Sequence, residues 1–256
     1  MSSISHVEAA PGSDGQLNSS ATTVDTAGSA GRLKSSRPKA LISWSSGKDS
    51  AFALHEVRRA GQFDVVGALT TVTETFGRVS IHGVRQEILH AQLEAAGLPP
   101  RIVPIPYPCP NQIYEARMGE AVASAVRQGI THIIFGDLYL EDIRAYREAK
   151  LAGTGVTPVF PLWERPTLPL AQAMIESGIE AWLATVDLKK LPASFAGRQF
   201  DAQLLADLPG GVDPCGENGE FHTCVAAGPM FARPLAVTTG ERVERDGYAY
   251  CDLILG

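Results

Sequence analysis

The sequence predicts an α/β protein whose parallel sheet carries helices on both faces, followed by a smaller C-terminal α+β region. Short apolar runs alternate with amphipathic segments between residues 40 and 186, and strands that alternate with helices form parallel sheets. From about Leu188 the pattern changes to segments rich in Gly, Pro and acidic residues. With 256 residues, 45% of them hydrophobic, the chain is long enough to bury the core of such a fold.

Residues 1–38 are expected to form a disordered tail ahead of this fold. They contain no Phe, Trp or Tyr and are rich in Ser, Thr, Ala and Gly, so they bury too little apolar area to offset the entropy of ordering. They have no apolar core of the kind that a secretory signal needs, and Glu8, Asp14 and Asp25 precede the first Arg, unlike in an organelle presequence. We therefore expect a cytoplasmic protein.

Five strands are expected, each from a short run of apolar and β-branched residues. The first run begins just after Pro38, and the fourth stops at Gly136. The predicted strands are 40–44, 65–72, 101–105, 131–135 and 179–186, the last of which is expected to complete the sheet.

Helices are expected between these strands, where apolar residues recur every three or four positions and a glycine follows. Val84, Ile88, Leu89 and Leu93 have this spacing ahead of Gly97. The predicted helices are 51–57, ending near Gly61, and 84–96, 113–128 and 168–177.

The loop after the first strand has the composition of a phosphate-binding loop. Small residues let backbone N–H groups converge on an anion, and the following helix adds its positive end. Lys48 offers a point charge, and Asp49 would hold Mg²⁺ against a pyrophosphate. The residues expected to bind the nucleotide here are Ser45, Ser46, Gly47, Lys48, Asp49 and Ser50. The alternative is an ordinary strand-to-helix turn with a Ser at the N-cap.

Two better-known nucleotide fingerprints do not fit. A Walker loop needs Ser or Thr after Gly-Lys, but Asp49 follows Lys48. A dinucleotide fingerprint begins at Gly153 and Gly155, but Pro158 stands at its third glycine.

A second polar segment, residues 135–148, follows the fourth strand. Carboxyl ends of parallel strands share one edge of the sheet, where ligands bind. Gly136 allows close backbone approach there, and Asp137 is a second candidate ligand for Mg²⁺. Arg144 and Arg147 could clamp a phosphate or a carboxylate bidentately, beside the acidic Glu141 and Asp142. The alternative is a solvated helix on which Glu141, Arg144 and Glu148 form ion pairs.

A third segment, residues 211–223, contains too many Gly and Asn residues for a helix or a central strand. It is expected to present Glu217, Glu220 and His222 together for acid–base work or for a metal. Cys215, His222 and Cys224 also suggest zinc, but the spacing is not standard and no fourth ligand is evident. A surface turn is the alternative.

His82 lies between the second strand and its helix, within residues 79–85. It is a candidate for facing the nucleotide. It could equally cap the helix or make its hydrogen bonds within the loop.

Taken together, these segments resemble one family. Residues 45–50 resemble the S-G-G-x-D-S loop of the N-type ATP pyrophosphatases. Ser46 stands where that family usually has a Gly, and a Ser adopts positive φ less readily than a Gly. With residues 80–85, 136–148, 186–191 and 211–223, the chain resembles the diphthine–ammonia ligase family of adenine nucleotide alpha hydrolase-like proteins.

The resemblance implies a Rossmann-like ATP pyrophosphatase fold. Residues 39–165 would form the nucleotide-binding domain. Residues 166–256 would contain the last sheet strand and the acceptor-binding region.

The resemblance also implies an ATP-dependent ligase that forms C–N bonds. ATP would adenylate a carboxylate, ammonia would displace AMP, and pyrophosphate would leave. In the named family the carboxylate belongs to diphthine, a modified His of elongation factor 2. ATP and Mg²⁺ would be the cofactors, with Asp49 and Asp137 as metal ligands.

Specific roles follow from the resemblance. The residues expected to act in catalysis are Lys48, Asp49, Glu217, Glu220 and His222. His82, Gly136 and Asp137 would join residues 45–50 in binding the nucleotide. The acceptor side would be lined by Glu141, Asp142, Arg144, Arg147 and Thr223. No glutaminase segment is visible, so ammonia would be free or supplied by another protein.

Charge and composition limit the alternatives. A net charge of −6 argues against a nucleic-acid partner, and with it against tRNA thiolation or lysidine formation. No apolar run approaches the roughly 20 residues of a membrane span. A related enzyme with a different acceptor remains open. So do a non-catalytic ATP sensor and a partner-binding domain, although the last leaves the Lys48–Asp49 pair unexplained.

Overall fold

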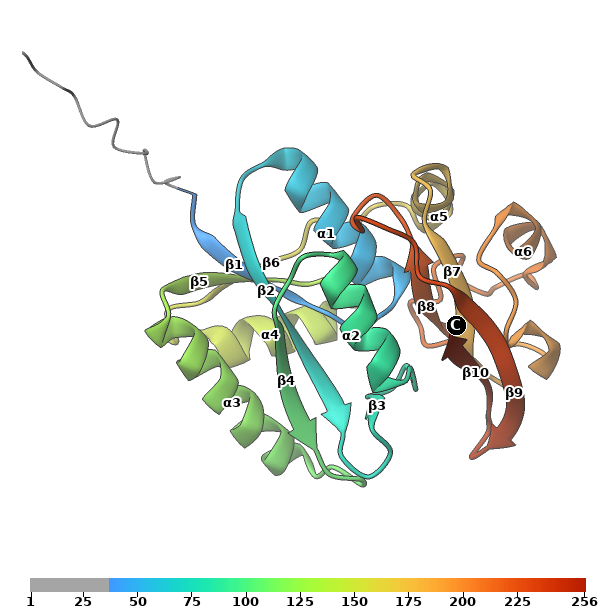
Figure 1. Cartoon of the computed structure of the whole chain (residues 1–256), viewed down its shortest axis with the longest axis horizontal. Coiled ribbons are helices and arrows are strands. Elements are labelled where there is room, and N and C mark those ends of the chain that lie inside the picture. The colour runs from blue at the N-terminus through green and yellow to red at the C-terminus, as the bar shows by residue number, and fades with distance from the viewer. Residues whose placement is uncertain (1–36) are drawn as a thin grey trace, which may run out of the picture. The chain divides into compact units, whose positions relative to one another are not determined.

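A parallel sheet begins immediately after Pro38 and organises the first half of the fold (Figure 1). The computed structural model describes residues 37–256, so the predicted tail lies outside the described residues except for Arg37 and Pro38, which are exposed. The parallel strands are β1 (Lys39–Ser43), β2 (Asp64–Thr73), β4 (Pro100–Ile105), β5 (Ile130–Ile134) and β6 (Thr157–Val159).

The strand order places a switch point beside β1. The parallel strands run in the order β4-β2-β1-β5-β6, and the short β3 (Arg78–Val79) pairs antiparallel with the end of β2. From β1 the chain first builds outward through β2 and β4, then returns to add β5 on the other side. In open α/β sheets this reversal is where ligands bind.

Helices cover both faces of this sheet, as predicted. α1 (Lys48–Ala60) and α2 (Gln86–Ala95) pack in one apolar cluster, whereas α3 (Asn111–Arg127) and α4 (Glu141–Leu151) pack in another. Side chains of a strand alternate between the two faces. Accordingly, Ala40 and Ile42 of β1 lie in the first cluster and Leu41 lies in the second.

The C-terminal part forms a second, antiparallel sheet in the order β8-β7-β10-β9. Its core joins the α1–α2 cluster, so the two sheets share one apolar interior on that side. Its strands are β7 (Glu180–Asp187), β8 (Phe221–Ala227), β9 (Val237–Arg245) and β10 (Tyr248–Leu255). Its helices are α5 (Thr167–Glu176), the 3₁₀ turn η1 (Ala193–Phe195) and α6 (Ala202–Asp207), which Asp201 caps through Leu204 N at 2.7 Å.

The predicted fold class is confirmed, but one strand was assigned to the wrong sheet. The run 179–186 was expected to complete the parallel sheet, whereas β7 pairs antiparallel with β8 and β10. The fifth parallel strand is instead β6, which is short and contains Pro158. A buried apolar strand has the same sequence pattern in either kind of sheet, so its pattern could not separate the two.

The region after Leu188 is also more regular than expected. It contains β8, β9, β10 and α6 in addition to loops. Among the described residues, no helix is both long enough and apolar enough to cross a membrane.

Gly136 fixes how closely β5 approaches α1. A Cβ on Gly136 would lie 2.8 Å from Asp49 C and from Ser50 N, which are backbone atoms that cannot move aside cheaply. Gly136→Ala is therefore expected to lower the free energy of unfolding by about 1–3 kcal/mol, as overpacking does. Urea denaturation measures this loss.

Gly119 of α3 is the matched control. A Cβ there meets nothing within 4 Å, so Gly119→Ala is expected to be neutral or to stabilise by up to about 1 kcal/mol. Equal effects of the two substitutions would contradict the close approach at Gly136.

Candidate functional site

A cavity of about 340 Å³ lies at the carboxyl ends of β1, β2 and β5 and is closed by residues of the second sheet. We call it the loop cavity. Most of the residues predicted from the sequence line it. They are Ser45, Lys48, Asp49, Ser50, His82, Gly136, Asp137, Arg147, Glu217, His222 and Thr223.

Ser46 adopts the backbone conformation that its place in the loop requires. Its φ is +70°, in the left-handed region that favours glycine. Its carbonyl accepts hydrogen bonds from Gln92 Nε2 at 3.2 Å and from Val225 N at 3.0 Å. Its Oγ is buried and has no hydrogen-bond partner. The strained turn is therefore held from two sides, by α2 and by β8.

Gln92 is a residue of the site that the sequence analysis missed. It is fully buried, and besides holding Ser46 it donates to Val225 O at 2.6 Å and accepts from Trp44 Nε1 at 3.1 Å. A signal for it exists in the sequence. It is a polar residue one turn after Ile88 on the apolar face of a predicted helix, and buried polar groups are usually paired.

Lys48 does not extend freely into the cavity. Its side chain is 2% exposed, and Nζ donates to Asp49 Oδ2 at 2.9 Å and to the carbonyl of Cys215. The ammonium also lies 5.4 Å from the ring centres of both Phe200 and Phe221. Burial opposes the charge, but Asp49, Cys215 and Glu217 together outweigh it, so the pKa of Lys48 lies above its ordinary value.

Thr223 connects the second sheet to the start of α1. Its Oγ1 accepts the Lys48 backbone N–H at 3.0 Å, so a residue 175 positions away satisfies the first turn of the helix. Its carbonyl accepts a hydrogen bond from His82 Nδ1, 3.1 Å away. His82 in turn packs against Gly47, where a Cβ would lie 2.6 Å from His82 Cε1.

His82 and His222 form a pair of neutral imidazoles in the cavity. Their ring centres are 4.8 Å apart. Burial lowers the pKa of His82 to about 4 and, with His82 and Lys48 adding to it, lowers the pKa of His222 to about 3. Because His82 Nδ1 donates to a carbonyl, its Nε2 carries a lone pair. The pair can accept hydrogen bonds at neutral pH without adding positive charge.

Asp137 and Arg147 form the second ion pair of the cavity. Arg147 donates to both carboxylate oxygens of Asp137, at 2.5 Å and 3.0 Å, and stacks on Phe135 at 4.4 Å. This bidentate pair matches the predicted presence of both residues at this edge of the sheet.

The other residues of that segment lie elsewhere. Arg144 pairs with Glu148 at 2.8 Å on the exposed side of α4 and stacks on Trp163 at 4.7 Å. Glu141 and Asp142 are exposed and do not line the loop cavity. For Glu141 and Asp142 the alternative of a solvated helix describes the placement, and the Arg144–Glu148 ion pair that it predicted is formed.

Glu217 and Glu220 point to different places. Glu217 lines the loop cavity, accepts Leu138 N at 2.8 Å, and has its pKa raised by burial to about 7. Glu220 is buried on the other side of the segment, where Asp213 N and Asn218 Nδ2 donate to its Oε1. The segment thus brings Glu217 and His222 to the cavity and leaves Glu220 to hold the loop itself.

A zinc site is not formed by the cysteines. Cys215 and Cys224 are buried free thiols. Within residues 37–256 no group of three or more His, Cys, Asp or Glu side chains could hold a metal. Mg²⁺ differs, since it typically takes one or two carboxylates with phosphates and water. Asp49 and Asp137 both line the loop cavity.

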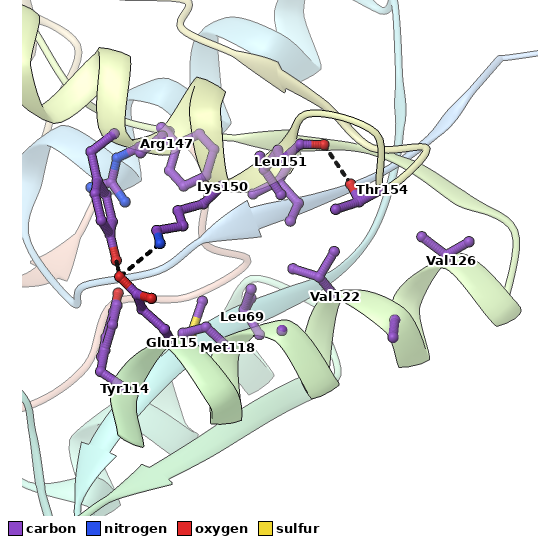
Figure 2. A pocket seen from close by; sticks show the side chains of 15 residues that line it. Leu69, Tyr114, Glu115, Met118, Val122, Val126, Arg147, Lys150, Leu151 and Thr154 are labelled. Atoms are coloured by element: carbon purple, nitrogen blue, oxygen red, sulfur yellow. Dashed lines mark hydrogen bonds and ion pairs between the residues drawn. The ribbon is translucent and has the colours of Figure 1, made fainter. Parts of the chain in front are cut away.

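A second, mostly apolar cavity of about 360 Å³ lies between α3 and α4 (Figure 2). Tyr114, Met118 and Val122 of α3 face Leu151 of α4 across it, and a Glu115–Lys150 ion pair of 2.8 Å lies at one end. It shares five lining residues with the loop cavity, so the two lie side by side. These are Leu69, Tyr114, Met118, Phe135 and Arg147.

The hydrogen bond from Lys48 N to Thr223 is expected to contribute measurably to stability. Thr223→Val keeps the shape and leaves a buried N–H unpaired, so the free energy of unfolding should fall by about 1–3 kcal/mol. Thr223→Ser keeps the oxygen and is the control. A Val variant as stable as the Ser variant in urea denaturation would contradict this role.

Glu217 is expected to make stability depend on pH. Its pKa of about 7 in the folded chain exceeds the ordinary 4.5. Between pH 5 and 7 the unfolded chain has therefore lost this proton, whereas the folded chain still binds it. The folded state therefore loses up to about 1.4 kcal/mol of stability per pH unit over that window. Glu217→Gln keeps the Leu138 hydrogen bond and should remove this slope. Parallel pH profiles for the two proteins would show the prediction to be wrong.

Comparison with known proteins finds one family over the C-terminal part of the chain. Residues 166–254 match the family model described as "Diphthamide synthase C-terminal domain". No match was found among curated proteins. The matched region contains segments 186–191 and 211–223, two of those that carried the sequence resemblance. The match covers the C-terminal third of the chain and agrees there with the resemblance to the diphthine–ammonia ligase family.

Proposed function

We propose that the protein is an ATP-dependent, AMP-forming ligase of the diphthamide type, which activates a carboxylate and joins it to ammonia. One observation carries the proposal. A single cavity receives a phosphate-type loop from the first sheet and Glu217 and His222 from the second. A binding module would need the loop, but it would not need a proton acceptor and neutral imidazoles beside it.

The loop cavity contains two ion pairs that suit a magnesium–nucleotide complex. In each pair, a cationic side chain can bind phosphate and a carboxylate can bind Mg²⁺. The two pairs are Lys48–Asp49 and Arg147–Asp137. On binding, the bases would turn to phosphate oxygens while the acids hold the metal. Every charge would keep a partner, which avoids the cost of an unpaired buried charge.

The fit to a nucleotide also rests on close contacts and on apolar surface. A Cβ at Gly136 would collide with the start of α1, so the loop after β5 can lie directly beside the helix terminus. Ser45 and Ser50 supply hydroxyls there. The apolar surface shared with the second cavity, at Leu69, Met118 and Phe135, would take the base.

The reaction divides between the two sides of the cavity. The acceptor carboxylate attacks the α-phosphorus of ATP and pyrophosphate leaves, with Lys48 and Arg147 compensating the charge that grows on it. Ammonia then attacks the acyl carbon, AMP leaves, and the nitrogen releases a proton. Glu217, with its pKa of about 7, is placed to accept that proton near neutral pH. Mg²⁺ would supply Lewis-acid stabilisation of the leaving phosphates.

We propose that the acceptor is the one that the diphthine–ammonia ligase family uses. Diphthine on elongation factor 2 is the first substrate to test. The direct experiment incubates the protein with ATP, Mg²⁺, ammonium and elongation factor 2 carrying diphthine, and resolves AMP from ADP. AMP and pyrophosphate that form only with the acceptor support the ligase. ADP as the product, or ATP binding without turnover on any carboxylate supplied, would overturn it.

Asp49→Asn is the sharpest variant for this site. The amide keeps the shape and can still accept from Lys48, but it removes the proposed metal ligand. AMP formation should fall by about 100-fold or more, the scale of losing one charged transition-state contact.

Asp64→Asn is the matched control, since Asp64 is exposed at the opposite end of the sheet, at the start of β2. It should leave turnover unchanged. Full activity in Asp49→Asn, with the fold verified by circular dichroism, would remove Asp49 from the mechanism.

A further inference from the structure

A groove of about 590 Å³ lies between the end of the parallel sheet and one face of the antiparallel sheet. We call it the inter-sheet groove. The β2–β3 turn and the loop after β4 form one wall, and β9 and β10 form the other. It shares Val79, Ser80 and Ile81 with the loop cavity, so it opens directly beside the proposed reaction site.

Aromatic rings line this groove and are unusually accessible. Phe76 is 44% exposed and Tyr107 is 61% exposed, and their rings meet edge to face at 5.0 Å. Tyr248 and Tyr250 of β10 lie opposite, with ring centres 6.3 Å apart. Exposed aromatic faces in a concave site are suited to binding organic cations.

The chain already places a cation on these faces. The guanidinium of Arg245 lies 5.7 Å from the ring centre of Phe76 and 5.5 Å from that of Tyr250, and so bridges the two walls. Its side chain is 62% exposed, and its partner Asp246 is 3.7 Å away and 73% exposed. An exposed ion pair of this kind holds its members weakly, and Arg245 also hydrogen-bonds the side chain of Tyr250, so an incoming cation competes with these two contacts for the ring faces.

Two of the three carboxylates that line the groove, Glu241 and Asp246, are exposed. Asp252 is neutralised by Arg78 at 3.0 Å and by Arg85 at 2.5 Å. Glu241 is exposed, lines the groove, and has no ion-pair partner in the described part of the chain. Displacement of Arg245 would leave Glu241 and Asp246 in the groove without that cation.

The junction with the loop cavity is strained. Ile81 has φ +69° although it is β-branched, and it is 76% exposed. A β-branched residue in this region is an outlier that the surrounding structure must hold in place. Ile81 thus presents an exposed apolar side chain at the rim that the two cavities share.

We propose that the inter-sheet groove binds a cationic side chain of the protein acceptor on the aromatic faces of Phe76 and Tyr250, which Arg245 occupies when the acceptor is absent. The groove is larger than one side chain, so neighbouring acceptor residues would lie along its apolar rim past Ile81. The link to an acceptor rests on the proposed function, whereas the cation site rests on the groove itself.

The test uses choline as the cation and 3,3-dimethylbutan-1-ol, its neutral isostere of the same shape, as the control. Binding to the full-length protein is followed by NMR titration in the absence of ATP. Choline should perturb the signals of residues 76–81 and 245–250, and the neutral isostere should not. Equal binding of the two, or no perturbation of these residues by choline, would overturn the proposal.

Two variants make the assignment specific. Phe76→Leu keeps an apolar side chain without a ring face and should weaken choline binding by about two- to fivefold, the equivalent of one exposed cation–π contact. Arg245→Ala should tighten it by a similar factor, because the competing cation is gone. Arg242→Ala removes the same charge from β9 at a position outside the groove lining and is the matched control.

The outcomes separate this inference from the proposed function. If neither Phe76→Leu nor Arg245→Ala changes the affinity for choline, the proposed cation site is wrong, whether or not the protein forms AMP. Choline binding that responds as expected in a protein that forms no AMP would leave the site intact and remove the ligase proposal.

Discussion

Burial of a charged lysine at the start of α1 is the constraint on which the rest of the site depends. Lys48 is 2% exposed, and its charge is balanced by Asp49, the Cys215 carbonyl and two aromatic rings. A buried charge that loses its partner destabilises a fold by about 3–5 kcal/mol. The second region must therefore dock wherever Lys48 is, because it supplies the carbonyl and the rings.

Docking in this way also positions side chains that line the loop cavity. The contact that caps α1, from Lys48 N to Thr223, also fixes the backbone on which His222 lies. The Cys215 carbonyl is two residues from Glu217, whose carboxylate accepts Leu138 N beyond β5. Hydrogen bonds that satisfy backbone N–H groups thus also assemble the loop cavity from both sheets. Glu217 and the two neutral imidazoles are placed as a consequence.

The sequence predicted what depends on local pattern and missed what depends on long-range pairing. The loop 45–50 was recognisable because a strand, a small polar turn and a helix follow one another, and the strain at Ser46 followed from its replacing a glycine. β7 was assigned to the wrong sheet because burial hides the pairing direction. β9 and β10 were missed although Asp246–Gly247, with φ of 54° and 82°, is a typical hairpin turn. The placement of Glu220 and Arg144 away from the cavity required the fold, since spacing alone does not say which way a side chain points.

The central claim is that both sheets contribute to one nucleotide site. Hydrogen–deuterium exchange with Mg²⁺ and α,β-methylene ATP, which resists cleavage at the bond in question, tests it most directly. We expect slower amide exchange in residues 44–54 and in residues 213–224 when the analogue binds. Protection confined to α3 and α4, or protection of the first segment without the second, would contradict the account.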